Sequence, residues 1–97
     1  MATFYAARFA GRRTASGERY DPEAMTAAHR SLPLGTWLRV TRIDAAGAPL
    51  SPAVMVRVND RGPYAAGRIL DLSLAAARRL GMLRAGVVRV RVEILRR

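Results

Sequence analysis

Two aspartates in the segment RVNDRGPYAAGRILDLS, residues 57–73, are the side chains of this sequence best suited to acid–base chemistry. Asp60 follows one short apolar run and precedes Arg-Gly-Pro, and Asp71 follows a second apolar run and precedes Leu-Ser. A pair of carboxyl groups can serve as proton donor and acceptor when their surroundings separate their pKa values. We therefore expect both aspartates to lie where a strand ends, and we treat both as candidate site residues.

Two further candidates, and the structural alternatives to each candidate, come from the surrounding segments. Glu18 lies in the polar loop TASGE, where the alternative is an exposed loop charge. His29 ends the segment TAAH, and a lone histidine is more often structural than catalytic. For Asp60 the alternative is a turn-initiating aspartate beside Arg61. For Asp71 it is a carboxylate that backbone N–H groups hold near a helix N-terminus, with a lowered pKa.

Several kinds of site are excluded by what the sequence lacks. There is no cysteine, which excludes disulfides and thiolate chemistry. Zinc would need carboxylates around the only histidine, so we expect no metal. The sequence has neither a G-x-S-x-G elbow nor a glycine loop ending in Gly-Lys-Ser/Thr. We expect no cofactor.

The composition predicts a single domain, residues 1–97, with a strong positive charge. Seventeen basic residues, all arginine, oppose seven acidic ones and give a net charge of +10. This charge fits a negatively charged partner such as nucleic acid, an anionic wall polymer or an acidic membrane face. The alternative is that the arginines only cover solvated surfaces. The arginines are scattered rather than gathered in one block. No apolar run is long enough to span a bilayer, and no signal peptide is visible at the start.

The hydrophobic pattern predicts short strands and one small helix. The valines at 54, 56 and 58 alternate with Met55, Arg57 and Asn59, and Ser73 is a predicted N-cap for a helix over Leu74–Leu80. A loop is expected over 11–24. Strands are expected at 3–9, 24–29, 36–43, 53–59, 68–70 and 87–95. Six short strands and one helix in a mainly β domain indicate a small closed barrel.

The order of several motifs resembles the rare lipoprotein A family over nearly the whole chain. TASGE, TAAH, LPLGT, VNDRGP and DLS occur in the family's order and at compatible spacings. The resemblance implies a six-stranded double-psi β-barrel with one short helix after Ser73. It also implies a lytic transglycosylase, which cuts peptidoglycan between N-acetylmuramic acid and N-acetylglucosamine and leaves a 1,6-anhydro product.

The resemblance also implies roles for the candidate residues. It places the family's acid at Asp60, a supporting glutamate at Glu18 and a histidine at His29. Asp71 matches the acid of barrel relatives that cleave cellulose. We therefore hypothesise that Asp60 is both general acid and general base, in one cleft with Glu18 and His29. Its pKa must then be raised by burial or by a neighbouring carboxylate.

Residues near these motifs are candidates for binding the glycan. Tyr64 offers a ring on which a sugar can stack, with rim packing as the alternative. Arg61 would oppose a raised pKa at Asp60, so we expect it to face away or to contact substrate. The substrate-binding candidates are Asp71, Arg61, Tyr64, Asp21 and Ser16.

Three other functions remain open from the sequence alone. One is a non-catalytic, expansin-like module that binds the wall, another is a glycan hydrolase, and the third is a basic barrel that binds nucleic acid. We expect glycan strands of peptidoglycan as the partner, no nucleic acid, a monomer, and a location in the bacterial cell envelope, in the periplasm or at the outer membrane.

Overall fold

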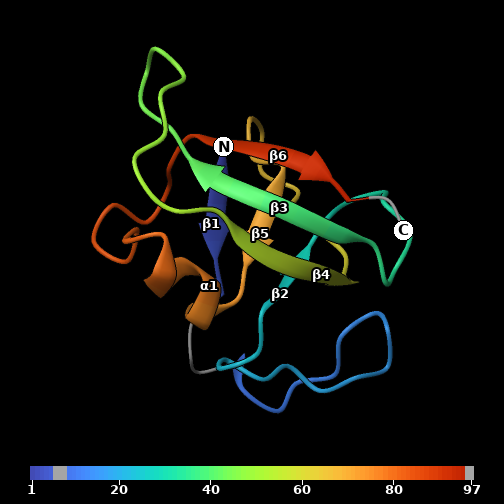
Figure 1. Cartoon of the computed structure of the whole chain (residues 1–97). Coiled ribbons are helices and arrows are strands. Elements are labelled where there is room, and N and C mark those ends of the chain that lie inside the picture. Colours follow the sequence, from blue (N-terminus) through green and yellow to red (C-terminus); the bar gives the residue numbers. More distant parts are fainter. Residues whose placement is uncertain (6–8, 96–97) are drawn as a thin grey trace.

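The computed structural model describes residues 1–5 and 9–95 of the chain. Over these residues the chain forms six strands and one helix (Figure 1). The elements in chain order are β1 (Ala2–Phe4), β2 (Thr26–Ala28), β3 (Trp37–Arg42), β4 (Val54–Asp60), β5 (Leu70–Leu72), α1 (Leu74–Arg79) and β6 (Val90–Ile94). The mainly β architecture with one short helix, expected from the sequence, is confirmed.

The strands form one curled sheet in the order β1-β5-β2-β4-β3-β6. The pairs β1–β5 and β2–β4 are parallel, and the other neighbouring pairs are antiparallel. Ala2 and Val88 exchange two backbone hydrogen bonds, of 2.8 and 3.0 Å, although β1 and β6 are the outer strands of the sheet order. This bridge connects β1 with the residues just before β6, and Figure 1 shows the N-terminal end of β1 close to β6. It covers part of an otherwise free strand edge.

The core lies inside the curl of the sheet and under α1. Val54, Val56 and Val58 are buried, whereas Met55 between them is 44% exposed, as the alternation predicts. Leu70 and Leu72 of β5 are fully buried and add to the same cluster. The alternation therefore sets which face of each strand packs inward.

A bulge changes the alternation at the end of β4. Ala27 pairs with Val58 of β4, but the next residue, Ala28, pairs with Asp60, so that Asn59 is the extra residue. Val58 and Asn59 are consequently both buried, and Asp60 is half-buried. Bulges of this kind redirect the side chains that follow them. Here the bulge presents the Asp60 side chain to a pocket instead of the core.

The helix begins at the predicted residue, Leu74, and ends at Arg79, one residue before the predicted end at Leu80. The Ser73 hydroxyl accepts a hydrogen bond from the backbone N–H of Ala76 at 3.3 Å and another from that of Thr26 at 3.4 Å. Gly81 follows the last turn with φ +67°, a conformation that favours glycine. None of the described residues forms a helix that is long and apolar enough to cross a bilayer.

Some predicted strand limits were wrong. β1 ends at Phe4, whereas a strand was expected over 3–9; residues 6–8 of that range lie outside the described residues. β5 covers Leu70–Leu72 instead of 68–70, so Asp71 lies within a strand and not after one. β6 begins at Val90, later than expected, because residue 88 pairs with β1 instead of β3.

Candidate active site

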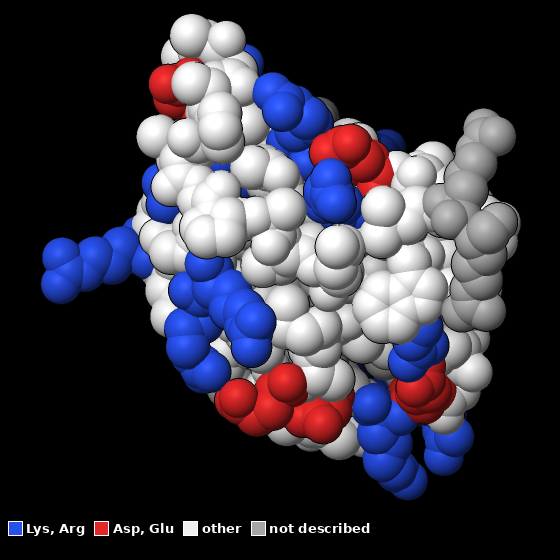
Figure 2. Space-filling view, in the orientation of Figure 1, with Lys and Arg blue, Asp and Glu red and all other residues white. Residues whose placement is uncertain are grey.

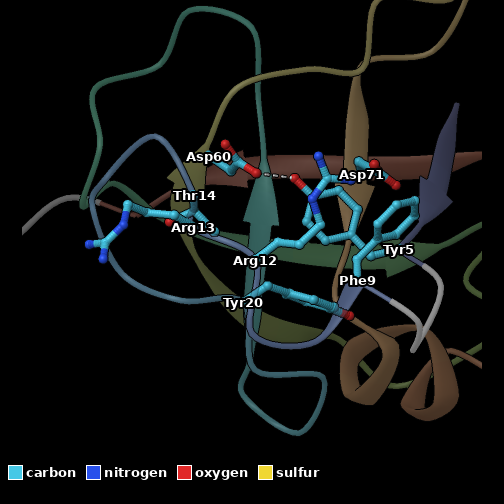
Figure 3. Close-up of a pocket in the computed structure, with 8 residues that line it drawn as sticks. All are labelled: Tyr5, Phe9, Arg12, Arg13, Thr14, Tyr20, Asp60 and Asp71. Atoms are coloured by element: carbon cyan, nitrogen blue, oxygen red, sulfur yellow. Dashed lines mark hydrogen bonds between the residues drawn. The ribbon is translucent and has the colours of Figure 1, made fainter.

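A pocket of about 320 Å³ lies beside the ends of β1 and β4 and contains both candidate aspartates. Its lining also includes residues of the loop that follows β1 (Figure 3). The lining residues are Tyr5, Phe9, Arg12, Arg13, Thr14, Tyr20, Asp60 and Asp71. The pocket therefore combines two carboxyl groups, three aromatic rings and two guanidinium groups.

Strand β2 explains why the two aspartates meet. β2 lies between β4 and β5, and Ala28 pairs with Asp60 on one side and with Asp71 on the other. The two aspartates are thus at the same level of the sheet, separated by one strand. Their α-carbons are about 10 Å apart if each strand spacing is about 4.8 Å, and both side chains reach the same pocket.

Asp60 accepts three hydrogen bonds. The Tyr5 hydroxyl donates to Oδ2 at 2.6 Å, which is the bond drawn in Figure 3. The backbone N–H groups of Ala15 and Arg61 donate to Oδ1, each at 2.9 Å. These donors fix the orientation of the carboxylate at the edge of the pocket.

Asp71 has fewer donors and a more buried environment. The hydroxyl of Thr3, its neighbour on β1, donates to Oδ1 at 2.9 Å. Burial raises the pKa of Asp71 and the negative charge of Asp60 raises it further, against the opposing hydrogen bond from Thr3. The alternative of a lowered pKa near the helix N-terminus is therefore wrong. A raised pKa favours the form of Asp71 that carries a proton.

The aromatic lining gives the pocket apolar walls beside these carboxyl groups. The Tyr5 ring meets the Tyr20 ring edge-on, with centroids 4.8 Å apart and planes at 80°. Phe9 lies 6.5 Å from Tyr5, and the guanidinium of Arg12 lies 5.2 Å from the Phe9 centroid. Burial, then the hydrogen bond to Asp60, raises the pKa of Tyr5, so its hydroxyl remains a donor. Apolar ring faces beside carboxyl groups suit a sugar, which has both apolar faces and hydroxyl groups.

Glu18 does not line this pocket. Its two carboxylate oxygens accept two hydrogen bonds from the guanidinium of Arg57, each at 2.8 Å. The Ser16 hydroxyl donates to one of the same oxygens at 3.1 Å. These bonds, from Arg57 first and Ser16 second, lower the pKa of Glu18 and keep it ionised. The expected cleft shared by Glu18, His29 and Asp60 is thus replaced by a pocket that contains Asp60 and Asp71.

The His29 side chain forms hydrogen bonds with the turn that follows it, and it does not line the pocket. Its Nδ1 accepts hydrogen bonds from the backbone N–H groups of Ser31 and Leu32, both at 3.1 Å. Burial, and then the positive charges of Arg61 and Arg30, lower the pKa of His29. A neutral imidazole whose Nδ1 accepts hydrogen bonds carries its proton on Nε2. The connection of His29 to Asp60 is through the backbone, N–H to C=O, at 3.1 Å.

A family model described as lytic transglycolase matches residues 1–92 of the chain. The chain belongs to the lytic transglycolase family. A relative from Nostoc sp., named probable endolytic peptidoglycan transglycosylase RlpA, is 56% identical over all of this chain and 25% of its own length. A protein from Treponema pallidum with the same name is 54% identical over 95% of this chain and 27% of its own length. The endolytic peptidoglycan transglycosylase RlpA of Pseudomonas aeruginosa is 49% identical over 95% of this chain and 26% of its own length. The chain therefore spans about a quarter of the length of these relatives.

In this member of the lytic transglycolase family, the substrate-binding candidates Arg61, Tyr64 and Asp21 differ in their contacts and in their exposure to solvent. The Arg61 guanidinium donates to the backbone carbonyls of His29 and Leu32, so it binds the neighbouring loop. The Tyr64 side chain is 75% exposed. Asp21 accepts a hydrogen bond from the N–H of Glu23 at 2.9 Å, as a turn residue does. These contacts leave substrate binding by Arg61, Tyr64 and Asp21 as predictions.

Several pocket residues of this lytic transglycolase domain are absent from the sequence-based predictions. Tyr5, Phe9 and Tyr20 flank the TASGE loop, and that cluster of aromatic residues is the signal that points to them. Arg12 and Arg13 begin the same loop. On the face seen in Figure 2 the arginines are scattered among other residues, as expected from the sequence. The positive charge in the lining of the pocket comes from Arg12 and Arg13.

Proposed function

We propose that this domain cleaves glycan strands of peptidoglycan as a lytic transglycosylase, between N-acetylmuramic acid and N-acetylglucosamine. The observation that carries the proposal is a single pocket with two aspartates, of which Asp71 has a raised pKa. The names of the relatives, endolytic peptidoglycan transglycosylase, support this substrate and this reaction. The domain then acts in the bacterial cell envelope, in the periplasm or at the outer membrane, as a monomer and without nucleic acid.

The reaction needs two proton transfers. The leaving glycosidic oxygen gains a proton as its bond to C1 breaks, and the C6 hydroxyl of the muramic acid loses one as its oxygen attacks C1. Asp71, whose protonated form is favoured by burial, is the donor in this proposal. Asp60, which accepts hydrogen bonds from three donors, receives the C6 proton. One proton then returns from Asp60 to Asp71 through solvent, and no water is consumed.

This division of roles differs from the hypothesis that Asp60 performs both transfers. It is supported by the different surroundings of the two carboxyl groups: burial raises the pKa of Asp71, whereas three hydrogen-bond donors hold the Asp60 carboxylate. Attack within one sugar also depends on position, since the reacting atoms are already in one molecule. The aromatic walls offer surfaces for the sugar faces, and Arg12 and Arg13 offer cations for the lactyl carboxylate.

Digestion of purified sacculi in ¹⁸O-labelled water, followed by mass spectrometry of the soluble products, tests the proposal. The expected products end in 1,6-anhydro-muramic acid without ¹⁸O. Asp60→Asn and Asp71→Asn are each expected to lower their release at least 100-fold, whereas Glu23→Gln, at an exposed ion pair with Arg78, leaves it unchanged. Reducing ends that carry ¹⁸O would identify a hydrolase. Binding to sacculi without soluble product would identify a non-catalytic wall-binding module.

A further inference from the structure

We propose that Glu18 is a positioning residue, which acts through Arg57 to hold the turn of residues 14–18 against β4. In that position the Ala15 N–H donates to the carboxylate of Asp60. The effect on rate rests on the proposed function, but the contact itself can be measured without any substrate. Glu18 then supports the site without contacting the glycan.

The turn of residues 14–18 maintains its own shape. The backbone N–H and the hydroxyl of Thr14 both donate to the carbonyl of Glu18, at 2.7 and 2.8 Å. Gly17 donates to the carbonyl of Thr14 at 3.0 Å and has φ +90°, which favours glycine. The internal bonds shape the turn but do not determine where it lies relative to the pocket.

Contacts with β4 determine that position. The N–H of Ser16 donates to the carbonyl of Asn59 at 3.0 Å, and the N–H of Ala15 reaches Asp60 at 2.9 Å. Glu18 and Arg57 add two parallel bonds of 2.8 Å between a planar carboxylate and a planar guanidinium. Such a two-bond pair fixes direction as well as distance. The turn is therefore attached at three points along the last four residues of β4.

The surroundings of Glu18 argue against a direct role in proton transfer. Its oxygens already accept bonds from Arg57 and Ser16, and its side chain is 46% exposed. Its lowered pKa leaves it without a proton to donate near neutral pH. A carboxylate in this state is suited to holding a cation in place.

A double-mutant cycle with Glu18→Gln and Arg57→Gln tests the proposal, with Glu23→Gln as the matched control. Glu23 forms the exposed ion pair with Arg78 at 3.3 Å, and neither residue lines the pocket. The first measurement, by NMR, is hydrogen exchange of the Ala15 amide and the movement of its proton signal as the pH is lowered. The second is release of anhydro products from sacculi.

If Glu18 acts through Arg57, each single variant speeds exchange of the Ala15 amide about tenfold and weakens the response of its proton signal to pH, because the contact with Asp60 is loosened. Product release falls about tenfold in each, as expected for a small displacement of a reacting group. The double variant matches the singles within about twofold, because both changes remove the same contact. Glu23→Gln changes neither measurement.

Two results would overturn this role for Glu18. One is an Ala15 amide whose hydrogen exchange and whose proton signal at each pH match those of the wild type in both single variants. The other is a large loss of product release in Glu18→Gln with normal release in Arg57→Gln, which would indicate that Glu18 acts directly. A wild-type chain that releases no product would contradict the proposed function alone, because the amide measurement still tests the contact.

Discussion

Asp60 and Asp71 pair with the same residue, Ala28, from opposite sides of strand β2. They are 11 positions apart in the numbering, yet they belong to strands that are not adjacent in the sheet. The shared partner places both carboxyl groups at one level and in one pocket. Burial raises the pKa of Asp71, and the negative charge of Asp60 raises it further. The register of a three-residue strand therefore places the second carboxylate where it adds to the effect of burial.

Replacing Asp71 by asparagine is expected to stabilise the fold while it removes activity. Asparagine retains an acceptor for the Thr3 hydroxyl but has no charge to bury. Because the pKa of Asp71 is raised in the folded state, the wild type loses stability as the pH rises through that value. The variant lacks this loss, so its melting temperature should exceed that of the wild type by a few degrees at pH 7.

Thermal unfolding followed by circular dichroism at several pH values provides the measurement. The difference between the two proteins should shrink toward about pH 3, below the pKa of about 3.9 at which the carboxyl group of the unfolded chain is half protonated. A variant that is less stable than the wild type at pH 7 would contradict the unfavourable burial of this charge.

Replacing Tyr5 by phenylalanine tests the hydroxyl that donates to Asp60 at 2.6 Å. The ring contact with Tyr20 is retained, so the fold should survive with a loss of about 1 kcal/mol in unfolding free energy. Product release from sacculi should fall about tenfold, because one carboxylate oxygen loses its fixed orientation. Normal release in this variant would show that the backbone donors of Ala15 and Arg61 suffice to orient Asp60.

His29 offers a comparison of two substitutions. Asparagine can accept hydrogen bonds from the following backbone as the imidazole does, whereas alanine leaves the N–H groups of Ser31 and Leu32 without that acceptor. We expect His29→Ala to lower the unfolding free energy by about 1 kcal/mol and His29→Asn to lower it less. Urea denaturation measures both. Equal losses would argue against the turn as the role of this side chain.

The same residue predicts a pH dependence of stability. The pKa of His29 is lowered by burial and by Arg61 and Arg30, so the folded state favours the neutral ring. Below about pH 6.5 the unfolded chain binds this proton first, and the wild type loses stability as the pH falls. His29→Asn should lose less stability than the wild type over the same acid range. Parallel curves for the two proteins would contradict the lowered pKa.

Ser73→Ala tests the junction between α1 and β2. The hydroxyl of Ser73 accepts from the backbone of Ala76 in the helix and of Thr26 in the strand, and the residue is 1% exposed. The loss of an N-cap and of a buried acceptor is expected to cost about 1–2 kcal/mol in unfolding free energy. Denaturant unfolding checks this value, and Ser73→Thr, which keeps a hydroxyl, should cost less.

The elements that were predicted well are those governed by neighbouring residues. The alternation of Val54, Val56 and Val58 is enough to predict β4, and Ser73 with Gly81 predicts the helix within one residue. Such patterns depend on which face of a local segment is buried. The family resemblance added the double-psi topology and the proposed function, but not the contacts of each side chain.

The parts that were missed depend on distant partners. The bulge at Asn59 is defined by the pairing of β2 with β4, and no sequence pattern within β4 predicts it. The pairing of Glu18 with Arg57, 39 positions away, is equally invisible in the sequence. The hydrogen bond between Tyr5 and Asp60 joins residues 55 positions apart. The shape of the site was therefore less predictable than the identity of its aspartates.

The bridge between Ala2 and Val88 has a consequence for folding. The first strand, from which Thr3 and Tyr5 reach the two aspartates, pairs with β5 on one side and with residue 88 on the other. Contacts between such distant parts of a chain form slowly, because a long loop must close before they contribute stability. The hydroxyl contacts of Thr3 with Asp71 and of Tyr5 with Asp60 join residues 68 and 55 positions apart, so they form only after loops of that length have closed.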